Sequence, residues 1–472
     1  MCFKTFIALS LIFVSACAPL TPERGKGSPY QTSSEKEDRH LDPRKEIGRE
    51  FLSAIRKELE FVNEPEVVSL VNRVGKHLVR AAGNDPDYYH FFVVKNNQIN
   101  AFAVPGGYIF IYDGLLKNID SVDALAGVLA HEIAHIERDH VYRNAKKSGI
   151  VDLATIAAII LGGVSGDSGA AKISIAQAAN ISMKLQMSRE LEEDADIFAI
   201  KYLRRSRYNL TGLSDLLKTL AYYERFSGAD MLPPYLSTHP GVGSRLVTAE
   251  VLSQDLPVDE EEKALAQWDW RRIVTILNAE NREGHGLSLK GNGDDKKMFN
   301  KEREHYLHGL YALKSQDLKK ARTEYLEAIR LNPNEPLYHS DMAMLYLQLK
   351  HMELAKVSAL KSLELSNSYA APHIVLAMAA KSEGNHEEAI KQFKEAEKMT
   401  PYDTFIHYQM GDCYHAFKKP VLMRLHLARF YRYNIKPENA LMQLHMALEE
   451  TEDKELIHQI SAEILSIKRD GI

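Results

Sequence analysis

Apolar side chains recur at helical spacing over much of the chain, and the exceptions mark other elements. Between residues 46 and 82 this spacing predicts two helices, which Glu64-Pro65 separates. Two aromatic and β-branched runs, residues 88–96 and 99–116, predict strands, and the turn Pro105-Gly106-Gly107 predicts a hairpin. Helical patterns dominate the rest of the chain. We therefore expect an α+β fold that is mostly helical.

A second pattern, with a period of 34 residues, runs through the C-terminal part. Its phased positions are Gly309, Ala343, Ala377 and Gly411; Ala321, Ala355 and Ala389; Tyr325, Ala359 and Phe393; and Pro333 with Pro401. Small residues where paired helices cross, with an aromatic residue and a proline on the second helix, resemble tetratricopeptide repeats. After Tyr414 the phase weakens, and Met423 stands where a small residue is expected, as in terminal capping hairpins. The pattern favours an all-α repeat solenoid over an unrelated helical bundle.

The N-terminus has the make-up of an export signal. An apolar run from Phe6 to Val14 follows Lys4 and is too short to span a bilayer. The tetrapeptide Val14-Ser15-Ala16-Cys17 resembles a bacterial lipobox, in which Cys17 becomes the lipidated first residue of the mature chain. The alternative is plain signal cleavage beside an incidental cysteine. Ala18 follows where an aspartate would indicate inner-membrane retention, so resemblance to bacterial lipoproteins implies the outer membrane.

These patterns divide the chain into five parts. We expect a lipoprotein signal peptide at 1–16, a flexible tether at 17–45, a compact domain at 46–255, a connecting segment at 256–300 and the repeat domain at 301–472. The tether is rich in proline, glycine, serine and charge, and it has too few apolar residues to become ordered. The apolar stretch at 150–166 is expected to be a buried helix, with a membrane-dipping or substrate-facing helix as the alternative.

Composition limits the classes of partner. A chain of 472 residues with 45% hydrophobic and 26% charged residues is typical of soluble globular protein. The formal net charge of −5 gives no sign of a nucleic-acid partner. Of the three cysteines, Cys2 would leave with the signal and Cys17 would carry lipid, so Cys413 would stay alone. No disulfide is therefore expected in the mature chain.

The stretch "GVLAHEIAHIERDH", residues 127–140, carries candidate metal chemistry. On a helix, His131 and His135 lie on one face and can aim their imidazoles at one point. Zinc accepts neutral imidazole and leaves one position for water, whose pKa it lowers, while Glu132 can move protons at that water. The alternative is a solvated helical face, and residues 137–140 have that composition. The two histidines, however, have apolar neighbours, where an unliganded pair would be costly.

The motif needs a third ligand, and a later helix offers one. The metzincin spacing, with glycine and then a third histidine after the motif, fails here. Residues 188–199, "SRELEEDADIFA", provide two pairs of acids four apart, Glu190 with Asp194 and Glu192 with Asp196. Small alanines share the face of Glu192 and allow a neighbouring helix to approach, whereas Glu190 shares its face with other acids. We therefore expect Glu192 as the ligand and Asp196 as the acid that orients a ligating imidazole.

"HEIAH" followed by "SRELEEDADIFA" resembles the zinc endopeptidases of the CAAX-prenyl-protease and HtpX type. The likeness covers roughly residues 46–250 and is greatest to the soluble periplasmic, BepA-like branch, which carries C-terminal tetratricopeptide repeats. Asp194 replaces the second glutamate of the family pattern S-R-x-x-E-x-E-A-D. The resemblance implies a gluzincin-type peptidase domain with one zinc ion per chain, with His131, His135 and Glu192 as ligands and Glu132 as general base.

Two further segments resemble the same family. "STHPGVGSR", residues 237–245, implies that His239 and Arg245 lie near the site. In such enzymes this histidine either stabilises the tetrahedral oxyanion or rests on the metal as a plug; a structural His-Pro turn is the alternative. "NAFAVPGGYIFI", residues 100–111, resembles the strand beside the cleft, whose exposed edge would hold substrate by strand addition.

Together these features predict a lipid-anchored periplasmic zinc endopeptidase that cleaves unfolded or misassembled proteins. The repeats would recruit substrates or an assembly machine through their concave face. A role in outer-membrane protein quality control follows only from the BepA-like layout. One alternative is a non-proteolytic chaperone or assembly scaffold with a structural zinc site. Another is an enzyme that stays latent until His239 leaves the metal.

Overall fold

The computed structural model describes residues 42–147, 188–226, 232–253, 270–279 and 301–472. The predicted signal peptide, lipidation site and most of the tether lie outside the described residues, as does the apolar stretch at 150–166. Within the described residues, no helix has both the length and the hydropathy that a bilayer span requires.

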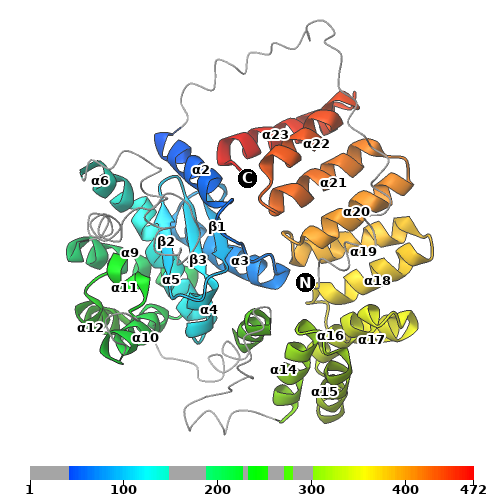
Figure 1. Cartoon of the computed structure of the whole chain (residues 1–472), viewed down its shortest axis with the longest axis horizontal. Coiled ribbons are helices and arrows are strands. Elements are labelled where there is room, and N and C mark those ends of the chain that lie inside the picture. The colour runs from blue at the N-terminus through cyan, green and yellow to red at the C-terminus, as the bar shows by residue number, and fades with distance from the viewer. Residues whose placement is uncertain (1–41, 148–187, 227–231, 254–269, 280–300) are drawn as a thin grey trace, which may run out of the picture.

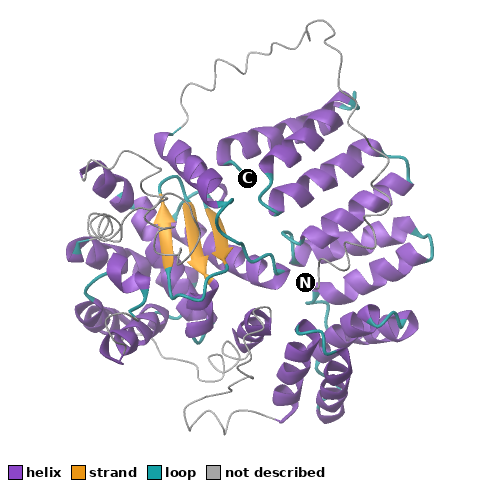
Figure 2. Cartoon of the chain, viewed as in Figure 1, coloured by secondary structure: helices purple, strands orange, loops and turns teal. Residues whose placement is uncertain are grey.

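The N-terminal part combines helices with one small sheet (Figure 1). Its elements are α2 (Pro43–Ile55), α3 (Pro65–Ala82), η4 (Pro86–Tyr88), β1 (His90–Val94), β2 (Ala101–Val104), β3 (Tyr108–Tyr112), α4 (Asp113–Asn118), α5 (Val122–Glu137), α6 (His140–Lys147), α9 (Arg189–Ser206), α10 (Thr211–Phe226), α11 (Pro234–Thr238) and α12 (Val242–Ser253). The predicted class, α+β and mostly helical, is confirmed (Figure 2).

The sheet has three strands in the order β1-β3-β2. β2 and β3 form the predicted antiparallel hairpin, and Gly106 and Gly107 supply the positive φ values of its turn. β1 pairs with β3 in parallel, which the strand pattern did not predict. The predicted strand at 99–116 was also too long, because it ends at Tyr112 and α4 begins at Asp113. There the Asp113 carboxylate accepts a hydrogen bond from the Asn96 backbone N–H at 2.7 Å.

Helix α5 runs through the core of this part. Its N-cap is Ser121, whose hydroxyl accepts from the Ala124 backbone N–H at 3.1 Å, and nearly every following side chain is buried. α5 packs against α3, α9, α10 and strand β2. At its crossing with α10, a Cβ added to Gly127 would lie 2.6 Å from the backbone nitrogen of Leu213, so glycine is required for this close approach. The helix is therefore held on all sides where it carries the candidate metal ligands.

The C-terminal part is a row of antiparallel helix pairs. Its helices are α14 (Lys301–Lys314), α15 (Leu318–Leu331), α16 (Pro336–Gln348), α17 (Met352–Leu365), α18 (Ala370–Ser382), α19 (His386–Met399), α20 (Thr404–Ala416), α21 (Pro420–Tyr433), α22 (Pro437–Glu449) and α23 (Lys454–Asp470). The phased alanines of the first and second helices of each pair are fully buried where the helices cross. The predicted tetratricopeptide architecture is confirmed.

A helix at residues 270–279 joins the two parts, within the segment expected to be polar and connecting. The buried Trp270 donates its indole N–H to the carbonyl of Ile119 at 2.6 Å. Two residues on, Arg272 donates to Glu66 of α3 at 2.7 Å and to Asp341 of α16 at 2.6 Å. These ten residues form a helix within the predicted connecting segment, and their apolar side chains pack against both parts of the molecule.

Candidate metal centre

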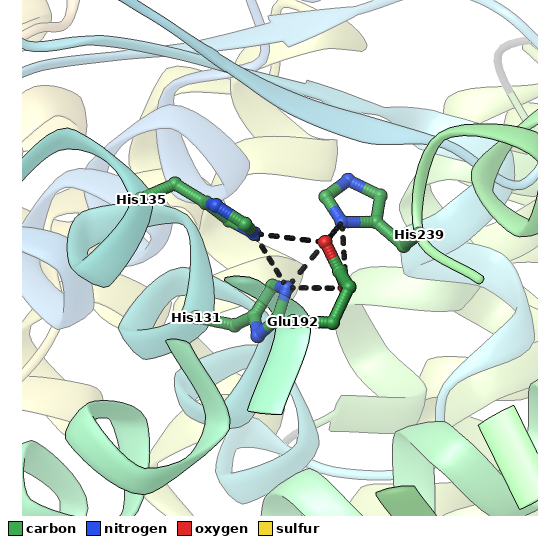
Figure 3. A group of neighbouring side chains, drawn as sticks. All are labelled: His131, His135, Glu192 and His239. Carbon is green, nitrogen blue, oxygen red and sulfur yellow. Dashed lines mark hydrogen bonds and ion pairs between the residues drawn. The ribbon is translucent and has the colours of Figure 1, made fainter. Parts of the chain in front are cut away.

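Helix α5 presents three side chains of the candidate motif to one buried point. His131, Glu132 and His135 have no solvent exposure. The helical spacing of four residues brings the Nε2 atoms of His131 and His135 to 3.0 Å from each other (Figure 3). Both imidazoles thus offer the same ring nitrogen to a common centre.

Helix α9 adds a carboxylate to this centre. The oxygens of the fully buried Glu192 lie 3.3 Å from Nε2 of His131 and 3.3 Å from Nε2 of His135. Ala195 and Ala199, on the same face of α9, are fully buried where the helix packs against the core. Small residues therefore accompany the close approach of α9 to α5, as the sequence pattern predicted.

His239 lies in the same group of donors rather than merely near it. It follows α11, and its Nδ1 lies 3.1 Å from Oε1 of Glu192 and 3.4 Å from Nε2 of His131. The ring of Tyr235 stacks on the His239 imidazole with centroids 4.2 Å apart. One atom from each of His131, His135, Glu192 and His239 lies within 4.8 Å of the others, as Figure 3 shows.

A buried ionic pair orients His131. Oδ1 of Asp196 lies 2.9 Å from Nδ1 of His131, the ring nitrogen that faces away from the centre. Arg245 of α12, itself 1% exposed, donates to both Asp196 oxygens at 2.7 and 2.8 Å and lies 2.6 Å from Glu192. With its proton on Nδ1, His131 keeps a lone pair on Nε2 for a metal. The structure therefore brings both Asp196 and Arg245 to the site.

Nδ1 of His135, the ring nitrogen that points away from the centre, faces His140. His140 lies in the stretch at 137–140, whose composition predicted exposure to solvent. His140 is 2% exposed, and its Nδ1 lies 3.1 Å from Nδ1 of His135. Its Nε2 lies 3.1 Å from Oδ2 of Asp194. The expectation of a solvated segment at 137–140 was wrong for His140, because the chain turns at Asp139, with φ of 55°, and folds His140 back under α5. The five-residue spacing from His135 was the only sequence signal for this contact.

Glu132 is buried without a hydrogen bond. Neither of its carboxylate oxygens has a hydrogen-bond partner among the described residues, and Nε2 of His239 lies 3.7 Å from Oε1. Burial raises the pKa of Glu132, whereas His239 and Arg245 hold the pKa of Glu192 well below its usual range despite burial. A buried carboxylate with free lone pairs beside a donor cluster is suited to proton transfer.

The donors and the charge of the site fit a divalent cation. Three buried carboxyl groups, those of Glu132, Glu192 and Asp196, lie at the site, and the guanidinium of Arg245 contacts two of them, Glu192 and Asp196. Burial and the charge of Arg245 lower the pKa of His131. Asp196 and Glu192 outweigh these effects and raise that pKa to about 9. The chain therefore favours added positive charge at the point where the four donors meet. Imidazole nitrogens and a carboxylate are the donors that zinc binds, and zinc displaces such a proton when it binds.

The surroundings of the centre leave room for a substrate. A cavity of about 290 Å³ reaches His135 and Ile136 and is bordered by the Pro105-Gly106 turn that ends β2, and by Tyr88 and Tyr89. β2 is the edge strand on the same side, since it pairs only with β3 among the described strands. The cavity thus borders one candidate ligand, His135, and the turn that follows β2.

Comparison with known proteins agrees with this geometry. Residues 67–252 match the model of Peptidase family M48, and residues 305–335 and 371–403 match a tetratricopeptide repeat model. The first match contains all four members of the donor cluster, together with Glu132 and Arg245. The members of this peptidase family depend on zinc.

Three relatives illustrate the similarity. The chain is 28% identical over 208 residues to the beta-barrel assembly-enhancing protease of Escherichia coli K12, which is 43% of this chain and 42% of that protein. It is 29% identical over 213 residues to the protein of that name from Yersinia pestis, covering 44% and 43%. The mitochondrial metalloendopeptidase OMA1 of Bos taurus is 31% identical over 179 residues, covering 35% and 32%. The matched regions thus span less than half the length of each of these relatives.

Proposed function

We propose that this chain, which carries an M48 peptidase domain at residues 67–252 and tetratricopeptide repeats behind it, is a zinc-dependent endopeptidase. The observation that carries the proposal is the buried donor group of His131, His135 and Glu192 beside the unpartnered carboxylate of Glu132. A purely structural zinc site is more often rich in cysteine. The only cysteine among the described residues is Cys413, in the repeats.

Each side chain has a distinct part in the proposed hydrolysis. His131, His135 and Glu192 would hold the zinc ion, which when bound polarises a carbonyl and lowers the pKa of water. Glu132 accepts a proton from the attacking water and passes it to the leaving amine. Asp196 and Arg245 keep the ring of His131 in place. The peptide bond is cleaved directly by water, without an acyl-enzyme.

The edge of β2 supports binding of an extended peptide. Its free backbone groups can pair with a substrate strand, which gives affinity for any unfolded segment with little demand on sequence. The strand leads to the cavity beside His135, so a bound segment would pass the donor cluster. We therefore propose unfolded or misassembled proteins as the substrate class.

The cellular setting is a proposal from two sources. The lipobox-like Val14-Ser15-Ala16-Cys17 after an apolar run supports export and a lipid anchor at Cys17. The names of the bacterial relatives connect those proteins with β-barrel assembly. We propose that this chain acts in the periplasm on outer-membrane proteins, with its repeats recruiting substrates or assembly machinery.

The substitution Glu132→Gln tests the proposal. Because it removes the proton acceptor but none of the proposed ligands, we expect zinc content and the melting temperature to stay unchanged. Casein cleavage should fall by at least about 100-fold, the scale of general-base catalysis. Zinc content is measured by elemental analysis and hydrolysis with labelled casein.

Three results would contradict the proposal. Equal hydrolysis by wild type and Glu132→Gln would indicate a contaminating protease or the scaffold alternative. A purified wild-type chain without zinc, or an unchanged zinc content after Glu192→Ala, would remove the enzymatic interpretation. The inactive Glu132→Gln form also serves to capture substrates from membranes.

A further inference from the structure

We infer that His140 and Asp194 are positioning residues that fix the ring of His135 for zinc binding. This role rests on the proposed zinc site, and it adds to that site two residues that no part of the family resemblance assigned. One of them, Asp194, is the position at which this chain departs from the family pattern.

A chain of hydrogen bonds connects the three side chains. Nε2 of His135 faces Glu192 and His131, so a metal at this nitrogen requires the ring proton on Nδ1. That N–H then donates to Nδ1 of His140 at 3.1 Å. His140 in turn carries its proton on Nε2, which donates to Oδ2 of Asp194 at 3.1 Å. Each contact determines the tautomer of the next ring, beginning from a carboxylate that can only accept.

The two candidate histidine ligands are thus supported in parallel ways. His131 donates directly to Asp196 at 2.9 Å, whereas His135 reaches Asp194 through His140. Asp194 and Asp196 stand two residues apart on α9, the helix that also carries Glu192. One helix therefore supplies a ligand, the direct partner of His131 and the carboxylate that His135 reaches through His140.

Asp194 is itself held in position from the solvent side. Nε of Arg138 donates to the same Oδ2 atom at 2.8 Å, and the Arg138 guanidinium lies 4.5 Å from the centre of the Phe198 ring. His140 sits beneath this pair, 2% exposed. Both ring nitrogens of His140 form hydrogen bonds, which a histidine that only fills space would not need. Substitutions of His140 can therefore distinguish a hydrogen-bonding role from a packing role.

The test compares two replacements of His140. His140→Leu fills similar space without hydrogen bonds, whereas His140→Gln keeps one acceptor and one donor in its amide. We expect His140→Leu to weaken zinc affinity by about 10- to 100-fold, as loss of an outer partner does, and His140→Gln to restore most of it. Affinity is measured by competition with a chelator, and the geometry by the absorption spectrum of the Co²⁺-substituted protein.

Variants of the partly exposed Asp194 provide the test if His140→Leu does not fold. Asp194→Ala should lower zinc affinity by about 10-fold, and Asp194→Glu should retain it. Arg138→Ala is the matched control, because it removes one contact of Asp194 but leaves the bond between His140 and Asp194 in place, and its zinc affinity should fall much less than that of Asp194→Ala.

Specific outcomes overturn the inference. Wild-type affinity in both His140→Leu and Asp194→Ala, with an unchanged Co²⁺ spectrum, would show that the hydrogen-bond chain does not support the ligand. Equal weakening by His140→Leu and His140→Gln would show a packing role instead. Both results leave zinc binding and casein cleavage by the wild type intact, so they are distinct from failure of the proposed function.

Discussion

Glu132 and Glu192 show how position alone separates two buried glutamates. Glu192 lies 2.6 Å from the guanidinium of Arg245 and 3.1 Å from the ring of His239, and these groups favour its charged form. Glu132 has no hydrogen-bond partner among the described residues, and burial raises its pKa. The first is suited to hold a cation and the second to exchange a proton.

The position of His239 in the donor group bears directly on its role. Its Nδ1 lies within 3.4 Å of both Glu192 and His131, inside the donor group, where it can take a fourth ligand position. We expect His239→Ala to increase the cleavage of short peptides severalfold, because that position becomes free for water and substrate. The rate is measured with a fluorogenic peptide at fixed zinc occupancy.

A decrease in the cleavage rate of His239→Ala would assign the other predicted role, stabilisation of the oxyanion. A loss of about 10²- to 10³-fold in kcat at unchanged zinc content would indicate that His239 stabilises the oxyanion in the transition state. An unchanged rate would support neither role and would leave a structural turn.

At the scale of elements, small residues decide how closely helices approach. α5 meets α10 at Gly127, and the repeat helices cross at glycine or alanine spaced by 34 residues. Gly309 and Gly411 occupy equivalent repeat positions but have different surroundings. A Cβ added to Gly309 would lie 2.5 Å from the Tyr325 ring, whereas one added to Gly411 would have its nearest atom at an ordinary 3.5 Å.

This pair gives a matched prediction. Gly309→Ala should destabilise the chain by about 1–3 kcal/mol, because the buried Tyr325 cannot move away without disturbing its neighbours. Gly411→Ala should be neutral or stabilise α20 by up to about 1 kcal/mol, since alanine favours the helix more than glycine. Denaturant unfolding of both variants checks the difference, and an equal effect of the two substitutions would contradict it.

At the scale of the whole molecule, the last helix returns to the first one described. The Tyr108 hydroxyl of β3 donates to the Asp470 carbonyl at 2.7 Å, and the Asp470 carboxylate lies 3.4 Å from both Lys45 and His90. Figure 1 shows α23 beside α2 at the point where the two parts meet. Together with Arg272, this contact joins the repeats to the N-terminal part at two separate places.

The folded chain should lose stability in acid because His90, beside Asp470, is buried. Burial lowers the pKa of His90 to about 4, compared with about 6.5 in an unfolded chain. Between these values the unfolded state binds more protons, so stability falls as the pH decreases from 6.5 towards 4. From pH 7 to pH 5 we expect a loss of about 2 kcal/mol from this residue.

Comparison with His90→Gln isolates that contribution. Glutamine keeps an acceptor for Lys45, whose Nζ lies 3.1 Å from Nε2 of His90, but it does not titrate. Amide exchange in α2 and α23, corrected for the intrinsic rate at each pH, should show acid weakening in wild type and much less in the variant. The same acid response in both proteins would exclude His90 as its source.

Local patterns in the sequence determined much of what lies within single elements. The helical spacing of His131, Glu132 and His135, the pairing of Glu192 with Asp196 and the hairpin turn all depend on residues close together in the chain. Periodicity records such relations, because side chains three, four or two residues apart share a face. The M48 and tetratricopeptide matches agree with these patterns.

Tertiary structure alone decided which separate segments meet. Five features each join residues that are distant in sequence or lie beyond a turn. They are the parallel pairing of β1 with β3, the helix at 270–279, the burial of His140 under α5, the position of His239 among the donors and the return of Asp470 to Lys45. No local spacing encodes these contacts, because they arise from how helices and strands pack around a common core. The composition of residues 137–140 predicted exposure to solvent, and only the packing of the chain showed that His140 faces inward.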